Sequence, residues 1–457
     1  MRDLFLLGFL AAFMALGLRK PFLLVLAYIY VDTVSPHQLS WGLLSAIPLS
    51  MITAALAMGA WLLFDSKSGM RIALRQWVMG LLLLWAGYTT LHAAIPVEAL
   101  TKWDWVWKTL LFAAFLPFTL RTRLRIEACV LILVLAAGTL VINGGIKTVL
   151  GGGGYGQLRI FIDSNSGLFE SSTLSSLAIA LIPLVLWLAR HGTIFPPDWR
   201  SKAFAAALVL ACLLIPVGTE ARTGLVCVAV LAVLMLRDVK RRFLYLGAAA
   251  FIGIAAVPFL PASFQERMGL IKGYETDSSA SSRIAVWGWT IDYTRDHPLG
   301  GGFGVYRLNR LQVQTVESRT SGDVTVTSAQ TFIDEGRAWH SAYFEMLGET
   351  GYPGLILFLT LHLLSLVRME VLRRRYAAAD GDKAWIAPLA TALQHFQIIY
   401  LVGAVFVAIA FNGLALMVLA TQIGLDNWVR RQERAARTSP GWNKRGPAAA
   451  AAAAAAA

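Results

Sequence analysis

His340 is the residue of this sequence best suited to acid–base chemistry. It lies in WHSAYFEMLGETGYPG, residues 339–354, where a polar stretch gives way to an apolar run. An imidazole has a pKa of about 6.5 and can accept a proton from a hydroxyl group near neutral pH. On a helix, Glu345 and Glu349 would form an i,i+4 pair on a different face from His340. Three residues would share the face of His340: Tyr343, Phe344 and Leu347. A histidine with a purely structural role is the alternative interpretation.

Three arginines could stabilise a phosphate beside this histidine. Arg222 lies in GTEARTG, between two apolar runs, and Arg159 follows the four glycines at 151–154. Arg283 begins an amphipathic segment that ends in HPLGGGFGVY. A guanidinium group presents a planar fork of donors to phosphate oxygens, and glycines let backbone N–H groups approach an anion closely. For Arg222, snorkelling at the lipid edge or pairing with Glu220 is the alternative.

The carboxylates and the other histidines form no recognisable metal motif. Asp292 and Asp296 are spaced i,i+4, and Asp334 is adjacent to Glu335. Arginines flank both pairs, which favours salt-bridged surface. His297 precedes a proline and is interpreted mainly as a turn residue. No histidine pair has HExxH or similar spacing, so we expect no metal site and no cofactor.

The composition indicates that lipid is the main solvent of the chain. Of its 457 residues, 57% are hydrophobic and 15% are charged, and the mean hydropathy is +0.61. Soluble proteins have about 25% charged residues, so this chain could not cover a water-facing surface. The net charge of +13 falls in short clusters between apolar runs, which is typical of membrane topology and argues against nucleic-acid binding. Membrane lipids and anionic lipid-linked substrates are the expected partners.

The apolar runs predict an all-α polytopic membrane protein. About thirteen runs have the length of a span, and the first two, within 4–34, are short enough to form one broken or partly re-entrant unit. That gives about twelve transmembrane helices with both ends inside. Five basic clusters alternate with connections poor in lysine and arginine. They lie within 67–75, 121–125, 190–202, 237–242 and 368–375. The positive-inside rule places them in the cytoplasm, and places His340 and the three arginines on the periplasmic side.

One polar insertion, residues 262–351, is large enough to form a periplasmic subdomain, which we expect to be mainly helical. It separates an N-terminal transmembrane bundle, 1–261, from the C-terminal transmembrane helices, 352–430. Residues 431–457 form a basic cytoplasmic tail whose final alanine run looks artificial.

Three motifs taken together resemble those of the O-antigen ligase and polymerase superfamily: GTEARTG, HPLGGGFGVY, and His340 followed by LGETGYPG. Their order and spacing match, as does the large loop ahead of the last spans, and the likeness extends from about Gly144 onward. Two positions depart from the family pattern. Ser341 stands where asparagine is frequent, and Glu220-Ala221 stands where serine is frequent.

The resemblance implies a metal-independent, inverting glycosyltransferase of the bacterial inner membrane, most like O-antigen ligase. Such an enzyme takes a polysaccharide from undecaprenyl diphosphate at the periplasmic face and transfers it to a lipid A–core sugar. On that pattern His340 corresponds to the base and Arg222 to a diphosphate contact, while Arg159 and Arg283 extend the set from the residue analysis. O-antigen polymerase and protein O-oligosaccharyltransferase share the motifs and stay open. A transporter of lipid-linked glycans is the alternative from another class, although the paired halves expected of one are not evident.

Overall fold

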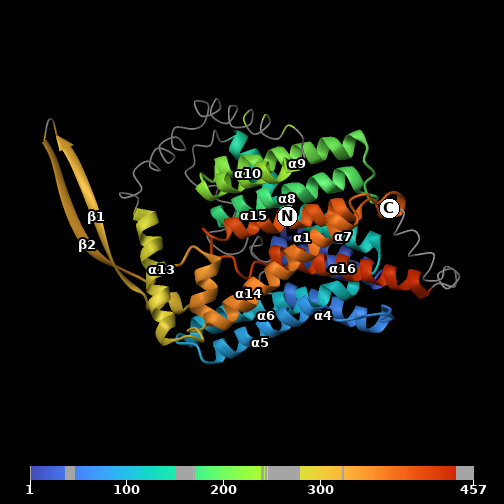
Figure 1. Ribbon diagram of the computed structural model, residues 1–457, viewed down its shortest axis with the longest axis horizontal. Helices are drawn as coiled ribbons and strands as arrows, with labels where there is room; N and C mark the ends of the chain where they lie inside the picture. Colours follow the sequence, from blue (N-terminus) through green and yellow to red (C-terminus); the bar gives the residue numbers. More distant parts are fainter. Residues whose placement is uncertain are drawn as a thin grey trace, which may run out of the picture.

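The computed structural model describes residues 2–36, 47–150, 168, 170–237, 241, 244, 247, 278–321 and 324–438. Within them the chain is a bundle of α-helices with a β-hairpin projecting beyond one end (Figure 1). The first helices are α1 (Arg2–Arg19), α2 (Phe22–Val34), α4 (Leu49–Phe64), α5 (Leu74–Leu91), α6 (Pro96–Thr119), α7 (Arg123–Leu150) and α8 (Ser171–His191). The later elements are α9 (Trp199–Gly218), α10 (Arg222–Met235), α13 (Ser278–Asp296), β1 (Arg310–Ser321), β2 (Val324–Glu335), α14 (Ala342–Arg375), α15 (Ile386–Gly403) and α16 (Gly413–Thr438).

The chain is a multi-pass membrane protein. In the part that the structure describes, α7, α8, α9, α14 and the segment Gly381–Gly403, which includes α15, are long and apolar enough to cross a membrane. Shorter apolar helices occur at Leu6–Arg19, Phe22–Val34, Leu49–Phe64 and Arg222–Met235. Most of the candidate span at 244–261 lies outside the described residues. The total of about twelve crossings stays a prediction.

The predicted basic clusters meet at one end of the bundle. Arg75 and Arg368, from the first and fifth clusters, bind opposite oxygens of Asp426 at 2.7 and 2.6 Å. Arg237, from the fourth cluster, lies 3.2 Å from Glu370. Because these ion pairs join segments far apart in the sequence, the loops that carry them must lie on the same side.

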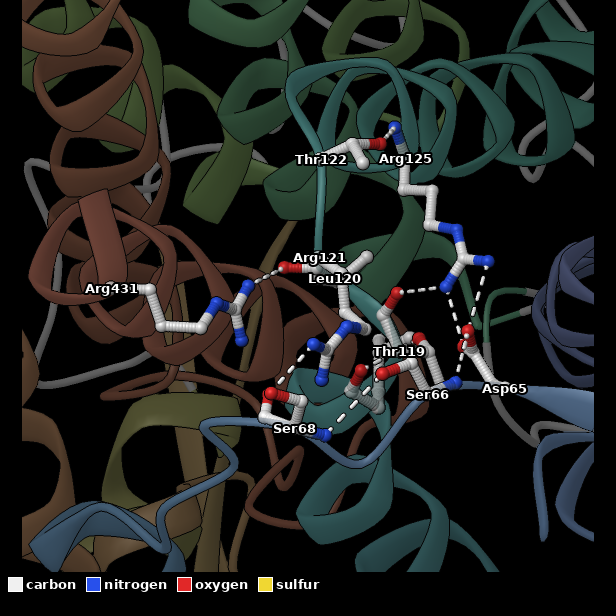
Figure 2. A network of polar contacts seen from close by, with 10 residues as sticks. Asp65, Ser66, Ser68, Thr119, Leu120, Arg121, Thr122, Arg125 and Arg431 are labelled. Atoms are coloured by element: carbon white, nitrogen blue, oxygen red, sulfur yellow. Dashed lines mark hydrogen bonds and ion pairs between the residues drawn. The ribbon is translucent and has the colours of Figure 1, made fainter. Parts of the chain in front are cut away.

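The second and third clusters join the same end. Arg123 donates to the carbonyl of His191 at 3.2 Å. Figure 2 shows Arg121 donating to the carbonyl of Ser68 and Arg431 donating to the carbonyl that precedes Arg121, at 2.7 and 2.9 Å. The prediction that all five clusters share one side is therefore confirmed. Which side of the membrane that end faces stays a prediction. We call it the basic end.

The helices alternate between the basic end and the opposite end. α8 reaches the basic end at His191, and α10 runs from Arg222 towards the basic cluster at Arg237. α15 finishes away from it, where Gly403 abuts Ser176 near the start of α8. The starts of α8, α10 and α14 and the end of α15 therefore share the opposite end, where α13 and the hairpin lie (Figure 1).

The segment 4–34 forms two antiparallel helices rather than one broken or re-entrant unit. Pro21 separates them, because it cannot donate the hydrogen bond that would continue α1. Phe22 lies near the basic end, with the guanidinium of Arg125 5.1 Å from its ring centre. Leu6 packs in one cluster with Val31, so the start of α1 points away from the basic end. The expectation that both ends of the chain share the basic end is wrong for this helix.

The described part of the 262–351 insertion is mixed rather than mainly helical. α13 has 19 residues, whereas β1 and β2 have 12 each and pair antiparallel along their whole length. β-Branched residues recur along both strands, and such residues favour extended backbone.

The break predicted near residues 351–354 occurs inside α14 and holds the glycine-rich turn against it. Gly351 has φ 64° and ψ −169°, which no helical residue adopts. Tyr352 donates to the carbonyl of Pro298 at 3.0 Å, and Gly301 donates to the carbonyl of Gly348 at 2.9 Å. The HPLGGGFG segment therefore packs along the first turns of α14.

Candidate active site

His340 lies in a short loop that is fixed on both sides. On one side, Trp339 Nε1 donates to Thr290 Oγ1 of α13 at 2.7 Å. On the other, the Ala342 N–H donates to the carbonyl of Ala404 at 2.8 Å. These bonds hold His340 at φ 47°, a left-handed conformation that costs about 1–3 kcal/mol. The expectation that His340 shares a helical face with Tyr343 is wrong, because α14 begins only at Ala342.

His340 lines a cavity at the end of the bundle opposite to the basic end. The cavity has a volume of about 840 Å³, within the range of about 300–1,000 Å³ that is typical of ligand sites. Its other titratable residues are Asp32, Glu98, Lys102, Asp104, Lys108, Glu170, Glu345 and Glu349. Its larger aromatic residues are Tyr28, Trp105, Tyr306, Trp339 and Phe411. The lining is therefore mixed, because aliphatic residues such as Val31, Val407 and Ile409 lie among the charged and aromatic ones.

The environment of His340 favours its neutral form. Burial lowers the pKa of the imidazole below its ordinary value, and the positive charges of Arg283 and Arg337 lower it further. The carboxylate of Glu170 acts in the opposite direction and raises the pKa. A neutral imidazole can accept a proton at pH 7, so the site is suited to general-base chemistry.

α13 brings Arg283 close enough to influence His340. Trp287, one turn after Arg283, donates to the carbonyl of Trp339 at 2.9 Å. Its ring also stacks on Phe344, with 4.8 Å between ring centres. α13 is thus docked against the residues on both sides of His340, and the field of Arg283 reaches the imidazole.

Arg222 lies at the same end of the bundle as His340 but does not line the cavity formed by the described residues. It is the first residue of α10 and is half-buried. Gly224, two residues on, abuts Ser175 of α8, and the next residue of α8, Ser176, abuts Gly403. The start of α10 therefore contacts α8, whose next residue contacts the end of α15, and the residue after α15 bonds to the loop of His340.

The remaining predicted residues fall outside the cavity or outside the described residues. Arg159 and the glycine run before it lie outside the described residues. His297 is an exposed turn residue stacked on Tyr293, with 4.3 Å between ring centres, in agreement with its interpretation as a turn residue. The acidic pairs are salt-bridged as expected: Asp292 lies 2.8 Å from Arg295, and Asp334 lies 3.0 Å from Arg337.

An ion cluster at the cavity wall was not predicted from the sequence. Lys102 of α6 lies 2.6 Å from both Glu345 and Glu349 of α14. The second oxygen of Glu345 accepts from the Ala410 N–H at 3.0 Å, and the other oxygen of Glu349 accepts from the Gly304 N–H at 3.1 Å. The sequence did contain an indication of this cluster. Glu345 and Glu349 lie one turn apart at the start of a membrane helix, where two carboxylates require a nearby cation. The identity of that cation depended on the fold, which brings Lys102 of α6 to the start of α14.

Two further carboxylates of the cavity were also missed. Glu170 precedes α8 and accepts from the N–H groups of Ser172 and Thr173, at 3.2 and 2.6 Å. Asp32 lies in the apolar helix α2, where an ionisable residue is itself a sign of function. Asp32 comes from the first apolar runs, which carry none of the sequence motifs, whereas Glu170 lies within the region of the resemblance but outside its three motifs.

Comparison with known proteins divides the chain near the start of α9. Residues 1–193 match a family of unknown function, DUF5935, and residues 205–359 match the O-antigen ligase family. The chain is also similar to the exopolysaccharide production protein ExoQ of Rhizobium meliloti (strain 1021), with 31% identity over 168 residues. That match covers 35% of this chain and 36% of the relative, so it spans about a third of each protein. The ligase-family region includes Arg222, Arg283 and His340.

Proposed function

Because residues 205–359 form an O-antigen ligase family domain, we propose that this membrane protein is an inverting, metal-independent glycosyltransferase. Its donor is a polysaccharide carried on undecaprenyl diphosphate. Its acceptor is a lipid A–core sugar, and transfer takes place at the periplasmic face of the bacterial inner membrane. The observation that carries the proposal is a half-buried imidazole that lines a large cavity and whose pKa is lowered by burial and by the positive charge of Arg283. Arg283 itself is not among the residues that line the cavity.

The proposed reaction is a single displacement at the anomeric carbon of the donor. His340 takes the proton of the acceptor hydroxyl as its oxygen forms the new bond to that carbon. The bond between the carbon and the phosphate oxygen breaks on the opposite face, so the configuration inverts. Arg283, whose charge acts on His340, is proposed to stabilise the charge that develops on the departing diphosphate. Arg222, at the same end of the bundle but outside the lining of the cavity, and Arg159 are proposed as further contacts.

Extension of a polysaccharide is the second candidate, favoured by the similarity to ExoQ. ExoQ is an exopolysaccharide production protein, and a polymerase would use the same donor with a second carrier-linked glycan as acceptor. The two reactions need the same base and the same leaving group. They differ only in the molecule that supplies the hydroxyl.

The acceptor decides between these candidates. The purified full-length chain in lipid vesicles would be given carrier-linked glycan, with and without lipid A–core, and the products separated by electrophoresis. A ladder attached to lipid A–core supports ligation. Longer carrier-linked chains that form without lipid A–core support polymerisation. Attachment to an added pilin-like protein would instead indicate protein O-glycosylation.

His340→Ala tests the mechanism in either case, and His297→Ala is the matched control. Both histidines lie in loops at the ends of α13 and α14, but only His340 lines the cavity. We expect His340→Ala to lose transfer by about 100-fold or more, as removal of a general base does, and His297→Ala to remain active. Normal transfer by His340→Ala would overturn the mechanism.

A further inference from the structure

The region of unknown function contributes its own wall to the cavity of His340. Asp32 comes from α2 and Trp105 from α6, both within residues 1–193. His340 and Tyr306 come from the O-antigen ligase family domain. Both regions of the chain therefore line the same cavity. Asp32 and Trp105 take no part in the proposed transfer step, so their contribution to the cavity is a separate question.

Asp32 is a carboxylate with spare hydrogen-bonding capacity at this wall. Its Oδ1 accepts from the Tyr28 hydroxyl at 3.3 Å and from Thr109 Oγ1 at 3.5 Å. Among the described residues, nothing donates to its Oδ2. A buried polar oxygen without a donor is unfavourable, so a ligand that supplies a hydroxyl hydrogen would be stabilised there.

Trp105 of α6 lies near Asp32 of α2, and contacts between the two helices hold them together. Thr109 lies within hydrogen-bonding distance of both, because its single hydroxyl hydrogen can be donated to the Trp105 carbonyl at 3.1 Å or to Asp32 Oδ1 at 3.5 Å. The ring of Tyr28 stacks on Phe112 of α6, with 3.7 Å between ring centres. The Trp105 side chain is 45% exposed. It can therefore receive an apolar ring face while Asp32 receives a polar edge.

The charged residues near Asp32 and Trp105 disfavour binding of the diphosphate or the polyprenyl tail of the donor at this wall. Its two lysines are already engaged, Lys102 by Glu345 and Glu349, and Lys108 by Asp104. Asp32 adds a further carboxylate. A diphosphate would be repelled by these groups, and a polyprenyl tail would leave them without partners.

We propose that Asp32 and Trp105 form a subsite for a neutral sugar of the glycan. The proposal rests on the proposed function and extends it, because it gives the N-terminal region a substrate-binding role. Asp32 accepts hydrogen bonds from hydroxyls on one edge of the ring, and Trp105 packs against its C–H face. The diphosphate then lies on the side of Arg283, with His340 between the two.

A binding measurement separates this subsite from the transfer reaction. The probe is the oligosaccharide released from the carrier lipid by mild acid, which carries neither lipid nor phosphate. Its dissociation constant would be measured by calorimetry on the full chain in detergent. We expect Asp32→Asn and Trp105→Ala each to weaken binding by about tenfold, the loss of one good contact.

Two further variants keep the result interpretable. Gly413→Ala pushes a methyl group against Asp32 Oδ2 and should weaken binding without altering the carboxylate chemically. Asp292→Asn, an exposed carboxylate on α13 outside the cavity, should leave binding unchanged. Should Asp32→Asn fail to fold, the exposed Trp105→Ala decides. Unchanged affinity in Trp105→Ala and Gly413→Ala, or no binding by the unaltered chain, would overturn the subsite. Transfer retained by His340→Ala would overturn the proposed function alone.

Discussion

Lys102 of α6 and Glu349 of α14 form an ion pair of 2.6 Å at the wall of the cavity. Glu349 is almost completely buried, with 1% of its side chain exposed, and Glu345 binds the same ammonium group at 2.6 Å. The carboxylates also accept from the N–H groups of Gly304 and Ala410. One cation therefore joins two helices and, through the carboxylates, two loops of the cavity.

Replacement of Lys102 by methionine should destabilise the fold. Two buried carboxylates would lose their shared cation, and breaking a buried ion pair costs about 3–5 kcal/mol. We expect the free energy of unfolding to fall by that amount, measured by denaturant unfolding in detergent. Lys108→Met is the control, because Lys108 pairs with Asp104, whose side chain is 70% exposed. Its effect should be below about 1 kcal/mol, and equal losses in the two variants would contradict the role of the cluster.

The pH dependence of transfer should report the lowered pKa of His340. The neutral imidazole is the active form, so kcat/KM should fall with pH only below the ordinary value of about 6.5. Arg283→Gln removes a positive charge that lowers this pKa, so it should move the acid limb to higher pH. Glu170→Gln removes a charge that raises it and should move the limb to lower pH.

Arg295→Gln is the control for this pair of shifts. Arg295 lies on the same helix as Arg283 but is 69% exposed and pairs with Asp292. Its removal should leave the acid limb in place. Shifts in the same direction for Arg283→Gln and Glu170→Gln would show that the limb belongs to a group other than His340.

Thr290→Val should loosen the loop of His340. It removes the acceptor of the Trp339 N–H inside the protein, where an unsatisfied buried donor costs about 1–3 kcal/mol. We expect kcat to fall more than KM rises, because the base loses its position while the cavity persists. Thr294→Val is matched, since Thr294 is equally buried and its hydroxyl bonds only to carbonyls of its own helix. If both variants lose kcat equally, the Trp339 bond does not position the base.

Features that depend on neighbouring residues could be predicted from the sequence. The basic clusters share one end because loop charge follows membrane orientation. The salt bridge of Asp292 and the turn role of His297 also follow from neighbouring residues. Even the break in α14 could be located, since Gly351 and Pro353 both disfavour a continuous helix.

The sequence was uninformative where a contact joins distant segments. Nothing near Lys102 indicates that its partners lie some 240 positions away, and Asp32 meets the cavity only because α2 packs on α6. The conformation of His340 has the same origin. Its left-handed backbone is imposed by bonds to α13 and to the end of α15, so a helical pattern predicted the wrong face.

Gly351→Ala should strongly destabilise this end of the bundle. The φ and ψ of Gly351 fall in a region that is essentially restricted to glycine, at a cost of about 1–3 kcal/mol for other residues. An added Cβ would also collide with the backbone of residues 298–300, and overpacking costs about 1–3 kcal/mol. We expect the free energy of unfolding to fall by about 2–6 kcal/mol, the range of these two costs together. Gly69→Ala is the control for a methyl group added at positive φ, because Gly69 has a φ of 67° and nothing within 4 Å of the new Cβ. Equal destabilisation by the two variants would mean that the glycine-rich turn is not packed against α14 as described.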